Sequence, residues 1–164
     1  MADLKLDPSI IESFKGDPML VYDNEDAEER VVILATQQNL LLLKRSPSWY
    51  VDATFKVAPQ LFYQVLVIQA ELPNHQGGAP WVFPCVYILL THKTQDIYLE
   101  AFIFLNSLLD FSPQVIMSDF EKAIRNSLSQ VFPSASVDGC YFHFCQAILR
   151  WVRENGLNKA YEAG

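Results

Sequence analysis

The sequence has few cysteines, few basic residues and no long hydrophobic run. Its three cysteines form no CxxC pair, and its amino terminus lacks the basic and apolar pattern of a secretory signal. We therefore expect an intracellular, reducing compartment. No apolar run reaches the roughly 18 residues that a membrane-spanning helix requires, so no membrane partner is expected.

The scarcity of basic residues limits what the chain can bind unaided. It has 12 Lys and Arg against 19 Asp and Glu, which gives a net charge of −7. Residues 1–30 hold nine acidic and three basic residues, and we expect an acidic, weakly ordered lead-in there. Residues 31–164 hold ten acidic and nine basic residues, without the basic stripe of a self-sufficient nucleic-acid binder. Binding to DNA by this chain alone is expected to be weak.

Hydrophobic residues make up 51% of the 164 residues, which suits one folded α/β domain. Apolar β-branched runs predict strands, and helical spacing after a capping residue predicts helices. The expected strands cover residues 31–35, 49–55, 61–70, 81–90, 115–119 and 135–140. The expected helices follow the capping residues Asp7, Thr36 and Thr94, and also cover about 121–130 and 142–154. Pro84 predicts an edge or a bulge in its strand.

Two aspartates accompany apolar strands and are candidate metal ligands. Asp52 lies inside one strand, and Asp119 ends another strand 67 residues later. Aspartate is rarely buried unless it is paired or binds a metal, and ligands collect beyond the carboxyl ends of strands in mixed sheets. The alternatives are a strand-edge Asp52 bonded to a turn, and an Asp119 that accepts from the backbone N–H of Glu121 or Lys122.

The residues around these aspartates resemble three blocks of Mutator-like (MULE) transposases. The first block is DATFKVAP with LFYQ, at residues 52–59 and 61–64, where Ala53 replaces the glycine common in the family. The second block is DFEKA, at 119–123, and the third is GCYFHFCQ, at 139–146. The resemblance spans about 31–157. It implies a ribonuclease H-like mixed five-stranded sheet with element order β-β-β-α-β-α-β-α.

The resemblance also implies a metal-dependent site. The family's catalytic carboxylates bind two Mg²⁺ (or Mn²⁺) ions, so Asp52 would bridge the metals and Asp119 would hold one of them. The family's third acid is a glutamate on a helix well beyond the cysteine–histidine block. This chain ends at Gly164, 21 residues after His143, and Glu154 is not assigned that role. We therefore expect a C-terminally incomplete domain with a tail at 158–164.

The cysteine–histidine block contains Cys140 and His143, with Cys145 nearby. A structural zinc site needs four N or S ligands, and only three cluster here, so zinc is disfavoured. We expect the block to support the active-site region or to approach DNA. Some basic residues are candidate phosphate contacts, with ordinary solvated positions as the alternative. These candidates are Lys56, Lys122, Arg150 and Arg153.

The expected function is that of a fragment of a DDE transposase domain. The ancestral activity implied by the resemblance is Mg²⁺-dependent DNA cleavage and strand transfer at transposon ends, in the nucleus. Without the third acid we expect a poor or inactive nuclease. The alternative is a host-retained, non-catalytic binding or assembly module derived from a transposase. An uncovered apolar face near the last helix is expected to favour self-association.

Overall fold

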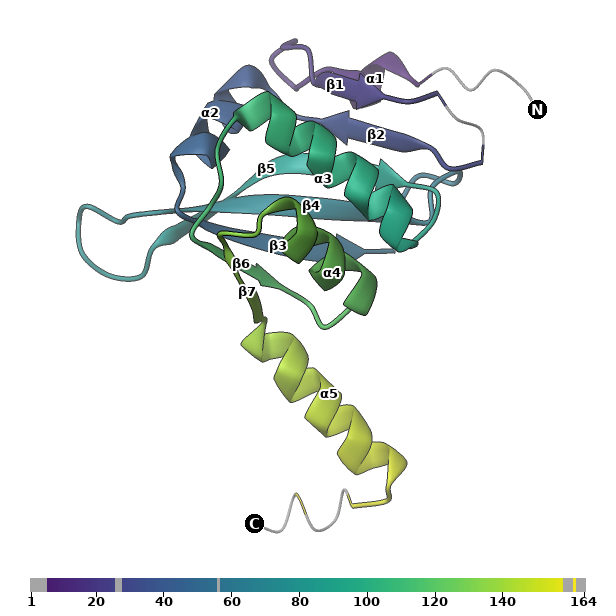
Figure 1. The fold of residues 1–164 in the computed structure, drawn as a ribbon, viewed down its shortest axis with the longest axis vertical. Coiled ribbons are helices and arrows are strands. Elements are labelled where there is room, and N and C mark those ends of the chain that lie inside the picture. Colours follow the sequence, from purple (N-terminus) through teal and green to yellow (C-terminus); the bar gives the residue numbers. More distant parts are fainter. Residues whose placement is uncertain (1–5, 26–27, 56, 158–160, 162–164) are drawn as a thin grey trace.

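The computed structural model describes residues 6–25, 28–55, 57–157 and 161 (Figure 1). Lys56 and nearly all of the tail 158–164 lie outside these residues. The strands are β1 (Leu20–Asp23), β2 (Val31–Leu34), β3 (Ser48–Thr54), β4 (Gln64–Leu72), β5 (Trp81–Leu90), β6 (Val115–Ser118) and β7 (Ser136–Gly139). The helices are α1 (Pro8–Ile11), α2 (Gln37–Arg45), α3 (Gln95–Leu109), α4 (Lys122–Val131) and α5 (Tyr141–Glu154).

The seven strands form one mixed sheet in the order β1-β2-β5-β4-β3-β6-β7. Strand β3 pairs antiparallel with β4 and parallel with β6, and β6 pairs parallel with β7. The mixed α/β class is confirmed, and the five expected strands of the sheet are β3 to β7. The count of five is wrong, because β2 pairs with β5 and β1 pairs with β2. Strand β1 belongs to the segment 1–30 that the sequence predicted as a lead-in.

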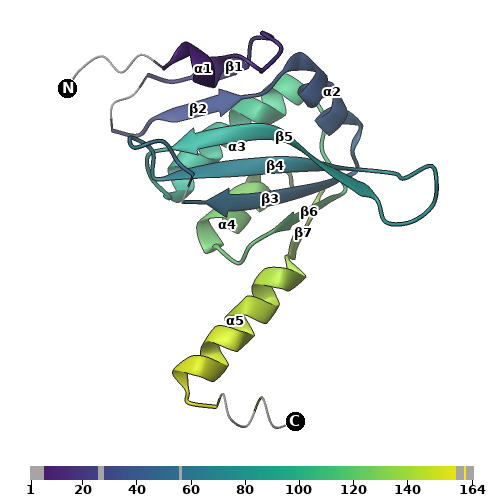
Figure 2. The same cartoon turned by 180° about the vertical axis from the view of Figure 1, so that it is seen from behind.

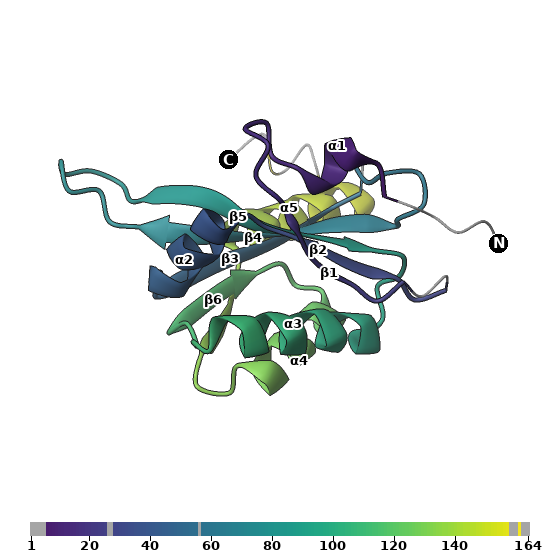
Figure 3. The same cartoon turned by 90° about the horizontal axis from the view of Figure 1, so that it is seen from above.

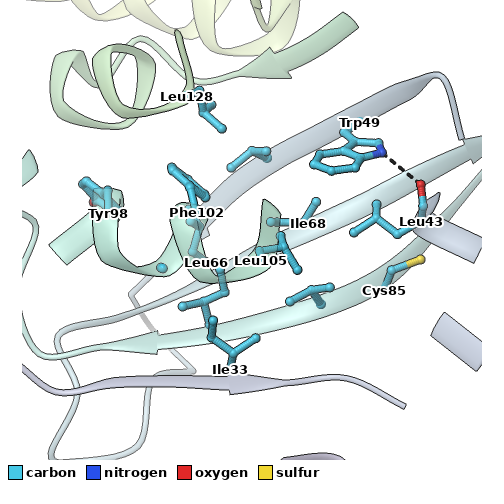
Figure 4. Packing of buried hydrophobic residues seen from close by; sticks show 14 of the residues in the cluster. Ile33, Leu43, Trp49, Leu66, Ile68, Cys85, Tyr98, Phe102, Leu105 and Leu128 are labelled. Carbon is cyan, nitrogen blue, oxygen red and sulfur yellow. Dashed lines mark hydrogen bonds between the residues drawn. The ribbon is translucent and has the colours of Figure 1, made fainter. Parts of the chain in front are cut away.

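Apolar side chains fill both faces of the sheet, unequally. Helices α3 and α4 cover one face, as Figure 3 shows, and the main core lies beneath them. In that core the indole N–H of the buried Trp49 donates to the carbonyl oxygen of Leu43 at 3.1 Å (Figure 4). A smaller cluster on the other face joins Val32 and Val65 to Ile10 of α1. The site described below lies on this less covered face.

Local signals in the sequence set several element boundaries. The Thr36 hydroxyl accepts from the Asn39 N–H at 3.2 Å, and the Thr94 hydroxyl accepts from the Ile97 N–H at 3.4 Å, so both expected caps are confirmed. Pro84 lies beside a register shift between β4 and β5, which confirms the expected bulge. Within the described residues, no helix combines the length and apolar character that a membrane crossing needs.

Helix α5 extends away from the sheet beyond β7, as Figures 1 and 2 show. Val152 is its single buried residue. Its apolar side chains are otherwise largely exposed, with Tyr141 at 76%, Phe142 at 62% and Trp151 at 58% of their full accessibility. The amino end of α5 lies at the candidate site, and the remainder of the helix points away from it.

Candidate active site

Asp52 and Asp119 follow paired residues of two adjacent parallel strands. Val51 of β3 pairs with Ser118 of β6. Asp52 directly follows Val51 in the sequence, and Asp119 directly follows Ser118. Val51 and Ser118 are buried. Because successive side chains of a strand alternate between faces, Asp52 points to the less covered face, and Asp119 directly follows β6 on a backbone roughly 5 Å away. The Asp52 side chain is 52% exposed, so water and ions reach it.

The carboxylate of Asp119 also organises the turn that leads into α4. Its Oδ1 accepts a hydrogen bond from the backbone N–H of Glu121 at 3.0 Å. The helix itself begins at Lys122, with Glu121 at the N-cap position. The expected hydrogen bond from the Glu121 N–H is therefore confirmed, whereas the expected N-cap position of Asp119 is wrong, because Glu121 occupies it. The hydrogen bond is compatible with metal binding because a carboxylate has two oxygens.

A series of buried hydrogen bonds supports this turn from the covered face of the sheet. The hydroxyl of Tyr98 donates to Glu121 Oε1 at 2.9 Å and accepts from the Gln64 side-chain amide at 2.5 Å. Tyr98 and Gln64 are fully buried. Burial, together with the nearby Glu121 carboxylate, raises the pKa of Tyr98, so the hydroxyl stays a neutral donor. The sequence analysis missed these hydrogen bonds. The available signal was Gln64, a polar residue inside an apolar run.

The cysteine–histidine block lies against the acid pair. Gly139 pairs with Ser118, and the next residue, Cys140, donates its backbone N–H to the Ser118 carbonyl at 2.7 Å. Cys140 thus lies directly after β7, at the N-cap of α5, next to the residues that follow β6. His143 Nε2 lies 3.6 Å from Asp52 Oδ1, which is beyond hydrogen-bond length but allows ionic attraction when the ring is protonated. In the described part of the chain, the buried His143 Nδ1 has no hydrogen-bond partner.

Tyr50 lies two residues before Asp52 on the same face of β3, and the sequence analysis gave it no role. Its hydroxyl donates to Glu71 Oε2 of β4. This hydrogen bond, followed by burial, raises the pKa of Tyr50 to about 12. Its two-residue spacing from Asp52 was the available signal, since residues i and i+2 of a strand share a face. Tyr50 joins β3 to β4 beneath the acid pair.

Of the candidate phosphate contacts, Lys56 lies outside the described residues, and the two arginines lie far from the acids. Lys122 is exposed at the first position of α4, three residues after Asp119. Arg150 and Arg153 are exposed on α5, seven and ten residues beyond His143. At 1.5 Å per residue, they lie roughly 10 and 15 Å further along that helix. Within the described residues, the two arginines therefore add little positive charge at the acid pair.

The donor set at the acid pair fits a hard divalent cation. Across the described ranges, no three His, Cys, Asp or Glu side chains converge on one point that could hold a metal ion. Mg²⁺, however, is commonly bound through one or two carboxylates, with water and substrate phosphates as its other ligands. Asp52 and Asp119 supply that number of carboxylates. The pair fits one such ion better than two.

Comparison with known proteins gives the family of the chain. A family model described as MULE transposase domain matches residues 48–147. These residues include β3 to β7 as well as Asp52, Asp119 and Cys140. Because the match covers more than half of the 164 residues, the chain belongs to this family of Mutator-like transposase domains, and the resemblance is confirmed. None of the curated proteins matches the chain.

Proposed function

We propose that this chain carries the two-aspartate part of a DDE transposase site on a ribonuclease H-like sheet. The observation that supports the proposal is the pairing of Val51 with Ser118 on parallel neighbours, because Asp52 and Asp119 are the residues that follow them. The strand order β5-β4-β3-β6-β7, with β4 antiparallel to its neighbours, supports the fold assignment. Strands β1 and β2 are an addition to that core.

In this proposal each residue of the site has a distinct role. Asp52 and Asp119 hold the divalent cation, and Glu121 orients the Asp119 carboxylate through its backbone N–H. Tyr98 fixes Glu121 from the buried side, and His143 lies beside Asp52 as a neighbouring positive group when protonated. Mg²⁺, when bound, stabilises negative charge on the reacting phosphate and lowers the pKa of a bound water or hydroxyl.

The proposed partner is DNA, and the proposed location is the nucleus, both by membership in the family. Two carboxylates leave a second metal ion short of protein ligands, and the net charge of −7 weakens attraction to phosphate. We therefore expect weak or absent cleavage by this chain alone. The alternative function, a non-catalytic binding or assembly module, is favoured by the exposed aromatic side chains of α5.

Calorimetric titration with Mg²⁺ and Mn²⁺ tests the metal site. We expect binding by the unaltered chain and none by the Asp52→Asn/Asp119→Asn variant. A matched control, Asp96→Asn/Asp110→Asn, removes the same charge from two exposed positions at the ends of α3 and should bind like the unaltered chain. Equal binding by all three proteins, or binding by none, would overturn the metal site. The second of these results would favour the binding-module alternative.

A further inference from the structure

Two exposed aromatic rings lie just beyond the carboxyl end of β3. Phe55 follows β3 directly, and Tyr63 directly precedes β4. Their exposed fractions are 49% and 47%. The rings meet edge to face, with centroids 5.4 Å apart and an interplanar angle of 77°. Phe55 is three residues beyond Asp52, so the pair lies about 10 Å along the strand from the acids.

These rings are accessible although the domain has ample apolar core. Trp49, Tyr98, Phe102 and Phe132 are fully buried, whereas Phe55 and Tyr63 remain half exposed beyond the end of β3. In an edge-to-face pair one ring presents its edge, so aromatic surface stays open to a third planar group. Every nucleobase has such a planar surface, and base stacking on exposed aromatics is the usual way to hold unpaired nucleotides.

The charged group near the rings indicates which kind of ligand the rings would bind. The Lys93 ammonium lies 5.6 Å from the centroid of the Tyr63 ring, within range of a cation–π interaction, and it can also meet a phosphate. Two rings and one ammonium provide a stacking surface and a phosphate contact for one nucleotide. The site therefore suits a single base.

We propose that Phe55 and Tyr63 form a stacking site for one unpaired nucleobase, on a DNA strand whose adjacent phosphate lies at Asp52 and Asp119. This inference rests on the proposed function, because it takes DNA as the substrate. It narrows the substrate class to DNA that is unpaired or unstacked next to the reacting phosphate. A base inside an intact duplex has both faces covered by its neighbours and must first be extruded at an energetic cost.

The test measures binding of a short single-stranded DNA that carries 2-aminopurine, whose fluorescence is quenched by stacking. The assay uses low salt and EDTA. We expect quenching by the unaltered chain, and a single-strand affinity at least about tenfold higher than that for the matching duplex. The Phe55→Leu/Tyr63→Leu variant should lose the quenching and bind the single strand about tenfold more weakly.

A second pair of exposed aromatics provides the matched control. Trp81 and Phe83 are 56% and 42% exposed, with ring centroids 6.4 Å apart. Phe83 pairs with Ala70, which pairs with Trp49, so this pair lies roughly 20 Å away at the amino end of β3. The Trp81→Leu/Phe83→Leu variant should bind and quench like the unaltered chain. Equal losses in both variants would show non-specific hydrophobic binding and overturn the proposal.

The assay conditions and one further variant keep this proposal separate from the metal site and from folding. The stacking assay contains EDTA and no metal, so failure of the metal site leaves the stacking result intact. Lys93→Met changes no ring, and it should weaken single-strand binding and reduce its salt dependence. Unchanged binding in both Phe55→Leu/Tyr63→Leu and Lys93→Met would overturn the proposal and assign the rings to a protein contact.

Discussion

Removing the hydroxyl of Tyr98 tests the buried hydrogen bonds that support the Asp119 turn. Tyr98→Phe keeps the ring and its packing but leaves the Gln64 amide without its acceptor and Glu121 without its donor. Gln64 is fully buried, whereas Glu121 is partly exposed and can turn to water. One buried polar group that loses its partner costs about 1–3 kcal/mol. We expect the free energy of unfolding to fall by about 2 kcal/mol.

Thermal and urea denaturation measure this loss. In a domain of this size a loss of about 2 kcal/mol lowers Tm by roughly 4–8 °C. Tyr63→Phe is the matched control, because it removes a hydroxyl from an exposed tyrosine and should change stability by less than about 0.5 kcal/mol. If Tyr98→Phe proves as stable as Tyr63→Phe, these hydrogen bonds do not stabilise the fold and the reasoning fails.

Two other predictions concern neighbours of the acid pair. Tyr50 has a pKa of about 12 when folded and 10.0 ordinarily, so its stabilising effect is complete below pH 10 and is lost between pH 10 and about 12. Tyr50→Phe should reduce this alkaline loss in urea titrations, and an unchanged profile would contradict it. Gly139→Ala places a Cβ 2.4 Å from the Phe120 ring and should cost about 1–3 kcal/mol. Phe120→Leu should relieve this cost, and strictly additive losses would exclude the clash.

The sequence predicted the main strands well because their signals are local. Runs of β-branched and aromatic residues give β3 to β7, and threonine caps give the starts of α2 and α3. The helix expected after Asp7 is shorter than predicted and ends at Ile11. Glu12 instead forms a bridge with Pro18, and the Ser13 hydroxyl accepts from the Asp17 N–H. Local hydrogen bonds to a turn replace the last helical turns there.

The site was only partly predictable, because part of it depends on distant pairings. Their place on apolar strands led to Asp52 and Asp119, and the family blocks added Cys140 and His143. The sheet pairs the residues directly before Asp52, Asp119 and Cys140 with one another. The roles of these four site residues remain predictions. No local signal in the sequence joins Gln64 of β4 to Tyr98 of α3, and their contact follows from how α3 crosses the sheet. By contrast, the sequence analysis expected an uncovered apolar face near the last helix, and most apolar side chains of α5 are exposed.

The exposed position of α5 has a consequence for local stability. A 14-residue helix is near the length at which isolated helices are marginal in water, and α5 buries only Val152. Its amides should therefore exchange with solvent through local opening of low free energy, while those of β3 and β4 exchange only on global unfolding. His143 lies in the first turn of α5. The fraction of time that an imidazole spends beside Asp52 is thus set by a helix–coil equilibrium, and not by the stability of the sheet.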